Sequence, residues 1–328
     1  MPDRRAFIGT VASGLIAAAF SAFGQQPLAK AYRIGYLGSM WASDYPERLE
    51  RLQANLRGLG YVGNRNIVVE VRAAEGRYDR LPELAAELVA LKVDVIIAEG
   101  PISALAAQHV TTTTPIVVAN AGNAVKSGLV ASLAKPGGNI TGMSFLLEEL
   151  TGKRLELLRQ AKPSIAKVGV LVNPSNPVFV QILAAARGEA ERDGVQIEPV
   201  EAGNAGAFEG AFSTVEKRGI DAILVHNDSL FLARGESIAA LAAKHRIASV
   251  GYWDFAKAGG LIGYGSSPTN NSRQIAVLVD KILRGAKPAD MPIEQPTKIE
   301  LVINLNTAKA LGLTIPQSLL LRADEVIQ

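Results

Sequence analysis

The sequence predicts an α/β fold of two lobes, each with a doubly wound parallel sheet, and a cleft between them. The first observation is the stretch DAILVHND at residues 221–228, in which an unbroken apolar run ends in polar groups. Such a run is typical of a strand covered on both faces, and ligands bind beyond the carboxyl ends of such strands. A similar stretch, DVIIAEGP, occupies residues 94–101 in the other half of the chain. The third observation is the alternation of strand and helix patterns throughout.

Bulk composition excludes several classes of protein. The 328 residues suffice for two domains with full cores. Lys and Arg number 34 against 31 Asp and Glu, and no basic run stands out, so no nucleic-acid partner is expected. There are no cysteines, which excludes disulfides, thiolate nucleophiles, Cys-based zinc sites and a lipid-modified N-terminal cysteine.

Residues 1–31 are predicted to be a signal peptide with a short leader. Arg4 and Arg5 form a positive start, and the apolar stretch that follows is too short for a confident membrane span. Small residues at two places fit a cleavage site, so we expect a mature chain that starts between residues 25 and 32; retention as an anchor is the alternative. With Phe7, the arginines resemble a twin-arginine signal, and Sec and Tat export both stay open. The expected location is the periplasm.

The first half shows strand and helix patterns in regular succession. The first strand is followed by a polar loop, and a helix then starts at Pro46 with leucines on one face. Later helices are expected at residues 79–91 and 103–110. Strands are expected at residues 32–38, 66–72, 93–100, 115–120 and 138–144, the last being the first crossover between lobes.

The second half repeats the rhythm. The helix at residues 271–283 has a clear apolar stripe that includes Ile275, Leu278 and Ile282. Residues 298–304 are predicted to be the last strand and residues 308–313 the last helix. Further helices are expected at residues 152–163, 179–193, 207–218 and 232–245, with strands at residues 167–172, 195–200, 221–228, 248–254 and 260–266.

Motifs of common catalytic sites are absent from the sequence. Gly35 and Gly38 lie in and at the end of the first strand without forming a G-x-G-x-x-G pattern, and no Walker A, H-E-x-x-H or G-x-S-x-G motif occurs. The histidines are scattered: His109 and His245 lie near predicted helix ends, where a solvated or capping role is expected. His226 follows a strand and could reach a ligand, although packing or a backbone hydrogen bond is the preferred interpretation.

Several segments resemble a known family. They are LAAELVALKVDVIIAEG, GLVASLAKPGGNITG, GKRLELL, AGGLIGYG and the C-terminal block that begins VDKILRGAKPADMPIEQPTKIELVINLN. The sequence is similar to the ABC-transporter substrate-binding family, in the branch that includes tryptophan- and tyrosine-binding proteins, from about residue 32 to the C-terminus. The resemblance implies a type I periplasmic-binding fold, with two Rossmann-like lobes, three crossovers, a ligand in the cleft and delivery to a membrane permease.

Two departures from the family pattern lie in predicted cleft loops. Asn123, Ala124 and Val125 stand where members often carry Asp-Pro-Val. Trp253 and Asp254 stand where many have Arg-Glu before a phenylalanine. The resemblance therefore implies the fold, while the ligand has to be inferred from this chain's own residues.

The leading hypothesis is an exported, monomeric solute-binding protein that closes on a small molecule and needs no cofactor or metal. The ligand is expected to be an amino acid or another small carboxylated or aromatic solute. An enzyme on the same fold is the second hypothesis, but a two-thiol racemase is excluded without cysteines. A repressor is disfavoured because an export signal stands where a DNA-binding headpiece would be. A periplasmic sensor that signals to a membrane receptor stays open.

Lobe 1 is predicted to comprise residues 32–144 with 262–287, and lobe 2 residues 145–261 with 288–328. Ligand-binding residues are expected at strand ends, because these face the cleft. The candidates are Ser39, Trp41, Pro101, Ser103, Asn120 and the backbone of Ala121 in the first lobe, and Asn173, Asn176, Asn227, Asp228, Tyr252 and Asp254 in the second.

An α-amino acid would use these groups in a definite way. Its carboxylate would lie near the helix start at Ser103, where free N–H groups favour an anion. Its ammonium would pair with Asp228 or Asp254, since a buried cation needs a carboxylate. Trp41 and Tyr252 could stack on an apolar or aromatic side chain.

Structural alternatives exist for some of the same residues. Asn173 and Asn176 flank prolines and could simply form a turn. Asp228 could cap the next helix. Trp41 could cover the surface of its lobe.

Overall fold

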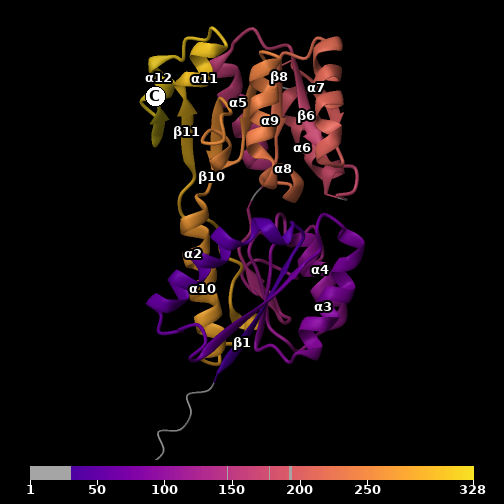
Figure 1. The fold of residues 1–328 in the computed structure, drawn as a ribbon, viewed down its shortest axis with the longest axis vertical. Coiled ribbons are helices and arrows are strands. Elements are labelled where there is room, and N and C mark those ends of the chain that lie inside the picture. The colour runs from indigo at the N-terminus through magenta and orange to yellow at the C-terminus, as the bar shows by residue number, and fades with distance from the viewer. Residues whose placement is uncertain (1–30, 146, 177, 192–193) are drawn as a thin grey trace, which may run out of the picture.

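The computed structural model describes residues 31–145, 147–176, 178–191 and 194–328, so nearly all of the predicted export segment lies outside the described residues. The described chain forms two lobes stacked along the long axis of the molecule (Figure 1). Among these residues, no helix has the length and apolar character needed to cross a membrane.

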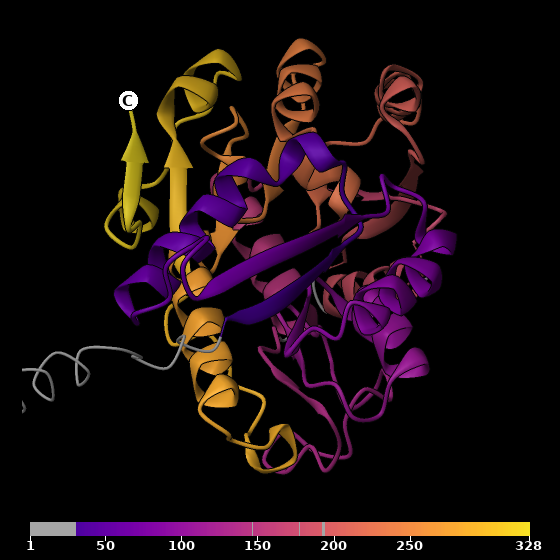
Figure 2. The same cartoon turned by 60° about the horizontal axis from the view of Figure 1, so that its bottom comes forward.

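The first lobe is built on a parallel sheet. Its described strands run in the order β2-β1-β3-β4-β5. Helix α10 packs against α2, although the two lie far apart in sequence, and Figure 2 shows α10 in orange alongside the N-terminal elements. The strands are β1 (Tyr32–Gly38), β2 (Ile67–Ala73), β3 (Val95–Ala98), β4 (Ile116–Val118) and β5 (Ile140–Gly142), and the helices are α2 (Pro46–Gly58), α3 (Leu81–Ala90), α4 (Pro101–Val110) and α10 (Pro268–Leu283).

The second lobe has a larger sheet, with described strands in the order β12-β11-β10-β9-β8-β6-β7. All neighbours are parallel except β10 and β11, which are antiparallel. The strands are β6 (Lys167–Val172), β7 (Gln196–Glu201), β8 (Ala222–Val225), β9 (Ala248–Gly251), β10 (Ile262–Gly265), β11 (Glu300–Asn304) and β12 (Glu325–Ile327), and the helices are α5 (Leu147–Ala161), α6 (Phe179–Glu191), α7 (Phe208–Lys217), α8 (Ser229–Ala233), α9 (Gly235–Lys244), α11 (Leu305–Ala310) and α12 (Gln317–Leu320).

Strand β8 shows why an unbroken apolar run predicts a sheet covered on both faces. Ala222 and Leu224 belong to one hydrophobic cluster, while Ile223 and Val225 belong to another. Successive side chains of a strand point to opposite faces, so apolar clusters cover both sides of this sheet. The polar residues that follow β8 lie at the carboxyl end of the strand, on the side of the sheet that faces the other lobe.

The described chain passes between the lobes three times: after β5, between β10 and α10, and between residue 294 and β11. The predicted boundaries differ here. The sequence predicts Ile262–Gly265 in the first lobe, but this strand pairs with β9 and β11 in the second sheet. It predicts residues 288–294 in the second lobe, yet Ile293 packs in a first-lobe cluster and Glu294 bridges to Met143. Apolar patterns locate elements but do not say which sheet they join.

Two other elements differ from expectation. The helix predicted over residues 232–245 is divided into α8 and α9 at Arg234, whose backbone leaves the helical region. The chain also continues past the predicted last strand to β12, which pairs with β11. A three-residue strand is too short to show a period, so only its pairing reveals it.

Candidate functional site

A cavity of about 220 Å³ lies between the lobes and is lined by residues of both. Part of its wall is formed by segments that directly follow strands, and helices of both lobes form much of the rest. Ser39 follows β1, Gly100 and Pro101 follow β3, and Asn227 follows β8. The carboxyl ends of the two sheets therefore meet at this cavity, as expected for ligand sites of open α/β sheets.

The structure brings many of the predicted site residues to the cavity wall, but not all of them. Four lie elsewhere: Trp41, Ala121, Asn173 and Asp228. The predicted residues that line the cavity are Ser39, Pro101, Ser103, Asn120, Asn176, Asn227, Tyr252 and Asp254.

Asp228 lies behind the wall and caps α8. Its carboxylate accepts from Leu230 N at 2.9 Å, and from Nδ2 of Asn173 at 3.3 Å and of Asn176 at 2.6 Å. The Tyr78 hydroxyl donates to it from the other lobe at 3.2 Å. Only 1% of Asp228 is exposed. A carboxylate so fully engaged is not available to a ligand ammonium, so the capping alternative describes its role.

The other three residues have structural roles. The Oδ1 of Asn173 accepts from Ser175 N at 3.0 Å, which is the turn expected of an Asn before proline. Ala121 is buried, and its N–H donates to Met143 O at 2.7 Å, so this backbone donor is already used. Trp41 packs against the core of the second lobe instead of the cavity.

The first-lobe wall also contains charged residues that were not predicted from the sequence, notably Arg48, Arg51 and Glu99. Oε2 of Glu99 accepts from the Tyr45 hydroxyl at 2.8 Å, and Arg48 Nη1 lies 3.5 Å from Oε1. Glu99 directly follows β3, so the strand-end rule could have found it. The arginines lie on α2 close to Leu52, which also lines the cavity. A charged residue on an amphipathic helix is ordinarily expected to be solvated, so the sequence did not single them out.

Arg154 of α5 was also missed, and it is the largest fully buried side chain of the described chain. Its Nε donates to Tyr264 O at 3.0 Å, and its Nη2 donates to Tyr264 O at 2.8 Å and to Asn227 Oδ1 at 3.0 Å. Burial lowers its pKa to about 10, so it is still charged at neutral pH. A signal existed: Arg154 shares the stripe of Leu150, Leu158 and Ala161, at helical spacings of four, four and three.

The turn after β9 brings Tyr252, Trp253 and Asp254 to the cavity. Burial raises the pKa of Asp254, while Arg48 and Arg51 partly oppose that shift. No hydrogen bond to the Asp254 carboxylate is found within the described chain, so it is free to meet a ligand. Lys257 Nζ lies 4.1 Å from the centroid of the Trp253 ring. The buried Nε1 of Trp253 has no hydrogen-bond partner among the described residues.

Gly263 of β10 allows this turn to lie against the sheet. A Cβ at this position would come within 2.3 Å of Trp253 O. No real Cβ tolerates that distance, so any other residue would push the turn away from the sheet. Gly263, which belongs to the AGGLIGYG segment, therefore helps to position the aromatic and acidic side chains of the cavity wall.

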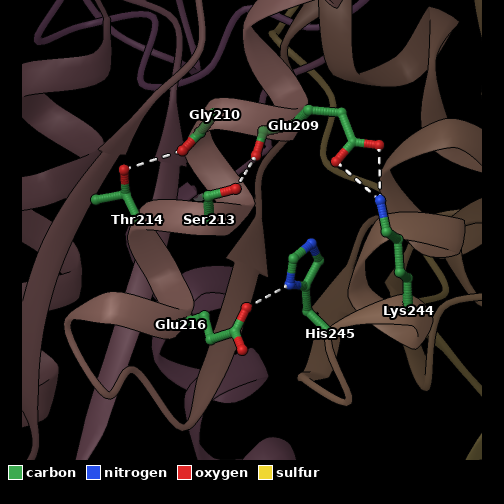
Figure 3. Close-up of polar contacts among 7 residues, drawn as sticks. All are labelled: Glu209, Gly210, Ser213, Thr214, Glu216, Lys244 and His245. Atoms are coloured by element: carbon green, nitrogen blue, oxygen red, sulfur yellow. Dashed lines mark hydrogen bonds and ion pairs between the residues drawn. The ribbon is translucent and has the colours of Figure 1, made fainter.

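The histidines lie away from the cavity wall. Burial lowers the pKa of His226 to about 4, and its ring packs edge-on against Phe231 with centroids 5.4 Å apart, as the packing interpretation predicted. His245 ends α9 and pairs with Glu216 of α7 at 3.0 Å, beside the Lys244–Glu209 ion pair (Figure 3). Within the described residues, no group of three or more His, Asp and Glu side chains could hold a metal ion.

Direct contacts join the lobes around the cavity. The hydroxyls of Ser39 and Ser229 are hydrogen-bonded to each other. Arg234 of the second lobe reaches the first, where its guanidinium lies 5.0 Å from the Trp41 ring centroid and 3.7 Å from Asp44 Oδ1. The cavity is therefore bounded by contacts that would have to break if the lobes moved apart.

Comparison with known proteins agrees with this arrangement. A tyrosine-binding protein of Clostridioides difficile (strain R20291) is 26% identical over 259 residues, which cover 79% of this chain and 74% of that protein. A solved structure of a conserved domain protein from Vibrio cholerae has a TM-score of 0.83 at 23% identity and covers 90% of this chain and 100% of that one.

The structure of an ABC domain in complex with L-Trp from Streptococcus pneumonia has a TM-score of 0.81 at 22% identity, covering 91% of this chain and 100% of that one. These likenesses show a fold similar to type I periplasmic binding proteins. The family model described as ABC transporter substrate binding protein matches residues 46–327. Because that match spans most of the chain, the protein belongs to the ABC transporter substrate-binding protein family.

Proposed function

We propose that this binding protein is exported to the periplasm, captures an α-amino acid with an aromatic or apolar side chain by closure of its lobes, and delivers it to an ABC permease as a monomer. The observation that carries the proposal is the chemistry of the cavity wall. Side chains of both charge signs, including Arg154, Glu99 and Asp254, line one small cavity together with the rings of Tyr252 and Trp253. A zwitterion with an apolar side chain matches these groups.

The relatives support the same ligand class. A tyrosine-binding protein is among the chain's relatives, and one solved structure of the same fold contains L-Trp. Aromatic rings in the cavity wall could stack on such a side chain. The likeness does not carry over residue by residue, so the ligand contacts proposed here rest on this chain's own side chains.

The test is a thermal-shift screen of the purified protein against the amino acids and small aromatic acids. A ligand that binds only the folded state raises the melting temperature, by about 5 to 10 °C when its concentration is about 100 times Kd. L-tyrosine or L-tryptophan is expected to give one of the largest shifts. Shifts produced only by sugars or other uncharged solutes would contradict the proposed ligand class.

Replacing Arg234 with alanine is expected to loosen lobe closure. The change removes the stacking on Trp41 and the ion pair with Asp44. Each contact is worth no more than about 1 kcal/mol at a partly exposed site. We therefore expect ligand affinity to fall by about 3- to 10-fold, and small-angle scattering of the unliganded variant to give a larger radius of gyration than that of the wild type.

Arg218→Ala is the matched control, because Arg218 pairs with Glu198 at 3.1 Å inside the second lobe. This variant should leave both the affinity and the scattering curve unchanged. Equal effects of the two replacements would mean that the Arg234 contacts have no special part in closure.

A further inference from the structure

The cavity is lined by a buried cation that has no counter-ion among the described residues. Arg154 is 1% exposed, yet no described carboxylate lies within ion-pair distance of its guanidinium. The ionisable side chains that influence the pKa of Arg154 are those of Tyr264 and Tyr252. Both tyrosines have a raised pKa and are neutral at pH 7, so neither balances the positive charge. Burial of an unpaired charge is costly, so proteins rarely keep one without a use.

The hydrogen bonds of Arg154 leave part of its guanidinium unused. A guanidinium has five N–H donors in a fixed planar arrangement. Nε and Nη2 are held by Tyr264 O and Asn227 Oδ1, and Nη1 makes no hydrogen bond with any described residue. The backbone and amide partners hold the plane in place, while Arg154 itself lines the cavity. The side chain is therefore prepared to receive an anion.

We propose that Arg154 binds the carboxylate of the ligand, so that the cavity selects solutes with a carboxylate. This inference deepens the proposed function and rests on it. It also replaces the expectation that the carboxylate lies near Ser103, since a fixed guanidinium without a counter-ion is a stronger anion site than free N–H groups. Asp254, with a carboxylate free of hydrogen bonds from described residues, is then left to face the ammonium.

The experiment compares two ligands on several variants. The probes are L-tryptophan and L-tyrosine, and the matching alcohols tryptophanol and tyrosinol, which keep the amine and replace the carboxylate with CH₂OH. Isothermal titration should show the wild type binding the acid about 10- to 100-fold more tightly than the alcohol, the range of a charge-assisted hydrogen bond. In Arg154→Met this ratio should fall to about 1, because only the acid loses a partner.

A second variant keeps the test valid if Arg154→Met does not fold. Asn227→Asp is nearly isosteric and places a carboxylate at the position that already accepts from Arg154 Nη2 at 3.0 Å. This internal counter-ion should occupy the guanidinium and repel an anion. The acid-to-alcohol ratio should therefore collapse as in Arg154→Met, while the melting temperature of the unliganded protein stays the same or rises.

Lys153→Met is the control, since it removes the same charge from the same helix at a lysine that pairs with Glu156 outside the cavity. The acid-to-alcohol affinity ratio of Lys153→Met should equal that of the wild type. If the wild type binds the amino acid but Arg154→Met or Asn227→Asp keeps the ratio, the role of Arg154 is wrong while the proposed function stands. If the wild type binds only uncharged solutes, both are wrong.

Discussion

Replacing Asp254 with asparagine is expected to weaken binding of an α-amino acid by about 10- to 100-fold. Asp254 lines the cavity, and its carboxylate accepts no hydrogen bond from the described residues, so an ammonium would be its natural partner. The variant keeps the size of the side chain and removes its charge. Isothermal titration of wild type and Asp254→Asn with L-tryptophan and L-tyrosine measures the effect.

The control for Asp254 is a ligand without the amine. Indole-3-propionate and 3-(4-hydroxyphenyl)propionate keep the ring and the carboxylate, and their affinity should not fall in Asp254→Asn. Burial raises the pKa of Asp254, so its carboxylate becomes protonated earlier than an ordinary aspartate as the pH is lowered. The wild-type protein should therefore begin to lose its preference for the amine at a higher pH during acidification. Equal losses for the amino acid and its deaminated analogue would show that Asp254 acts on the shape of the site and not on the ammonium.

Asp228→Ala is expected to lower the free energy of unfolding by about 3 kcal/mol. The change removes the cap of α8, worth about 1 kcal/mol, and leaves the buried amides of Asn173 and Asn176 without their acceptor. Thermal and denaturant unfolding of the unliganded protein measure the loss. The sequence suggests a ligand role for Asp228. In the structure its carboxylate is engaged by the protein, so the replacement is expected to affect stability more than ligand binding.

Asp228→Asn separates the two contributions. The asparagine side chain can still accept from Leu230 N, but its amide cannot accept from both neighbouring asparagines. We expect a loss about half as large as that of the alanine variant. A change below about 1 kcal/mol in Asp228→Ala would mean that water satisfies the two amides and that this cluster contributes little to stability.

Much of the fold and part of the site could be predicted from the sequence. The apolar run before His226 indicated a strand covered on both faces, and the leucine and isoleucine spacings indicated α10 and its buried stripe. The rule that polar residues after parallel strands face a cleft placed Ser39, Asn120 and Asn227 correctly at the cavity wall. These are consequences of local periodicity and of chain direction in a sheet.

The same rule could not tell which of two neighbouring polar residues faces the cavity. Asn227 lines the cavity while Asp228 turns away to cap α8, although both follow β8. The choice depends on the backbone direction at the strand end and on partners such as Asn176 and Tyr78, which are distant in sequence.

Apolar spacing along the chain was enough to predict the α/β class, the two lobes and the strand ends that meet at the cavity. Which charges have no partner among the described residues became known only from the way the lobes pack. Arg154 occupies the buried stripe of its helix, and nothing local says whether a carboxylate will meet it. That depends on long-range packing, which brings Tyr264 and Asn227 to its guanidinium as neutral acceptors and places no carboxylate of the described residues beside it.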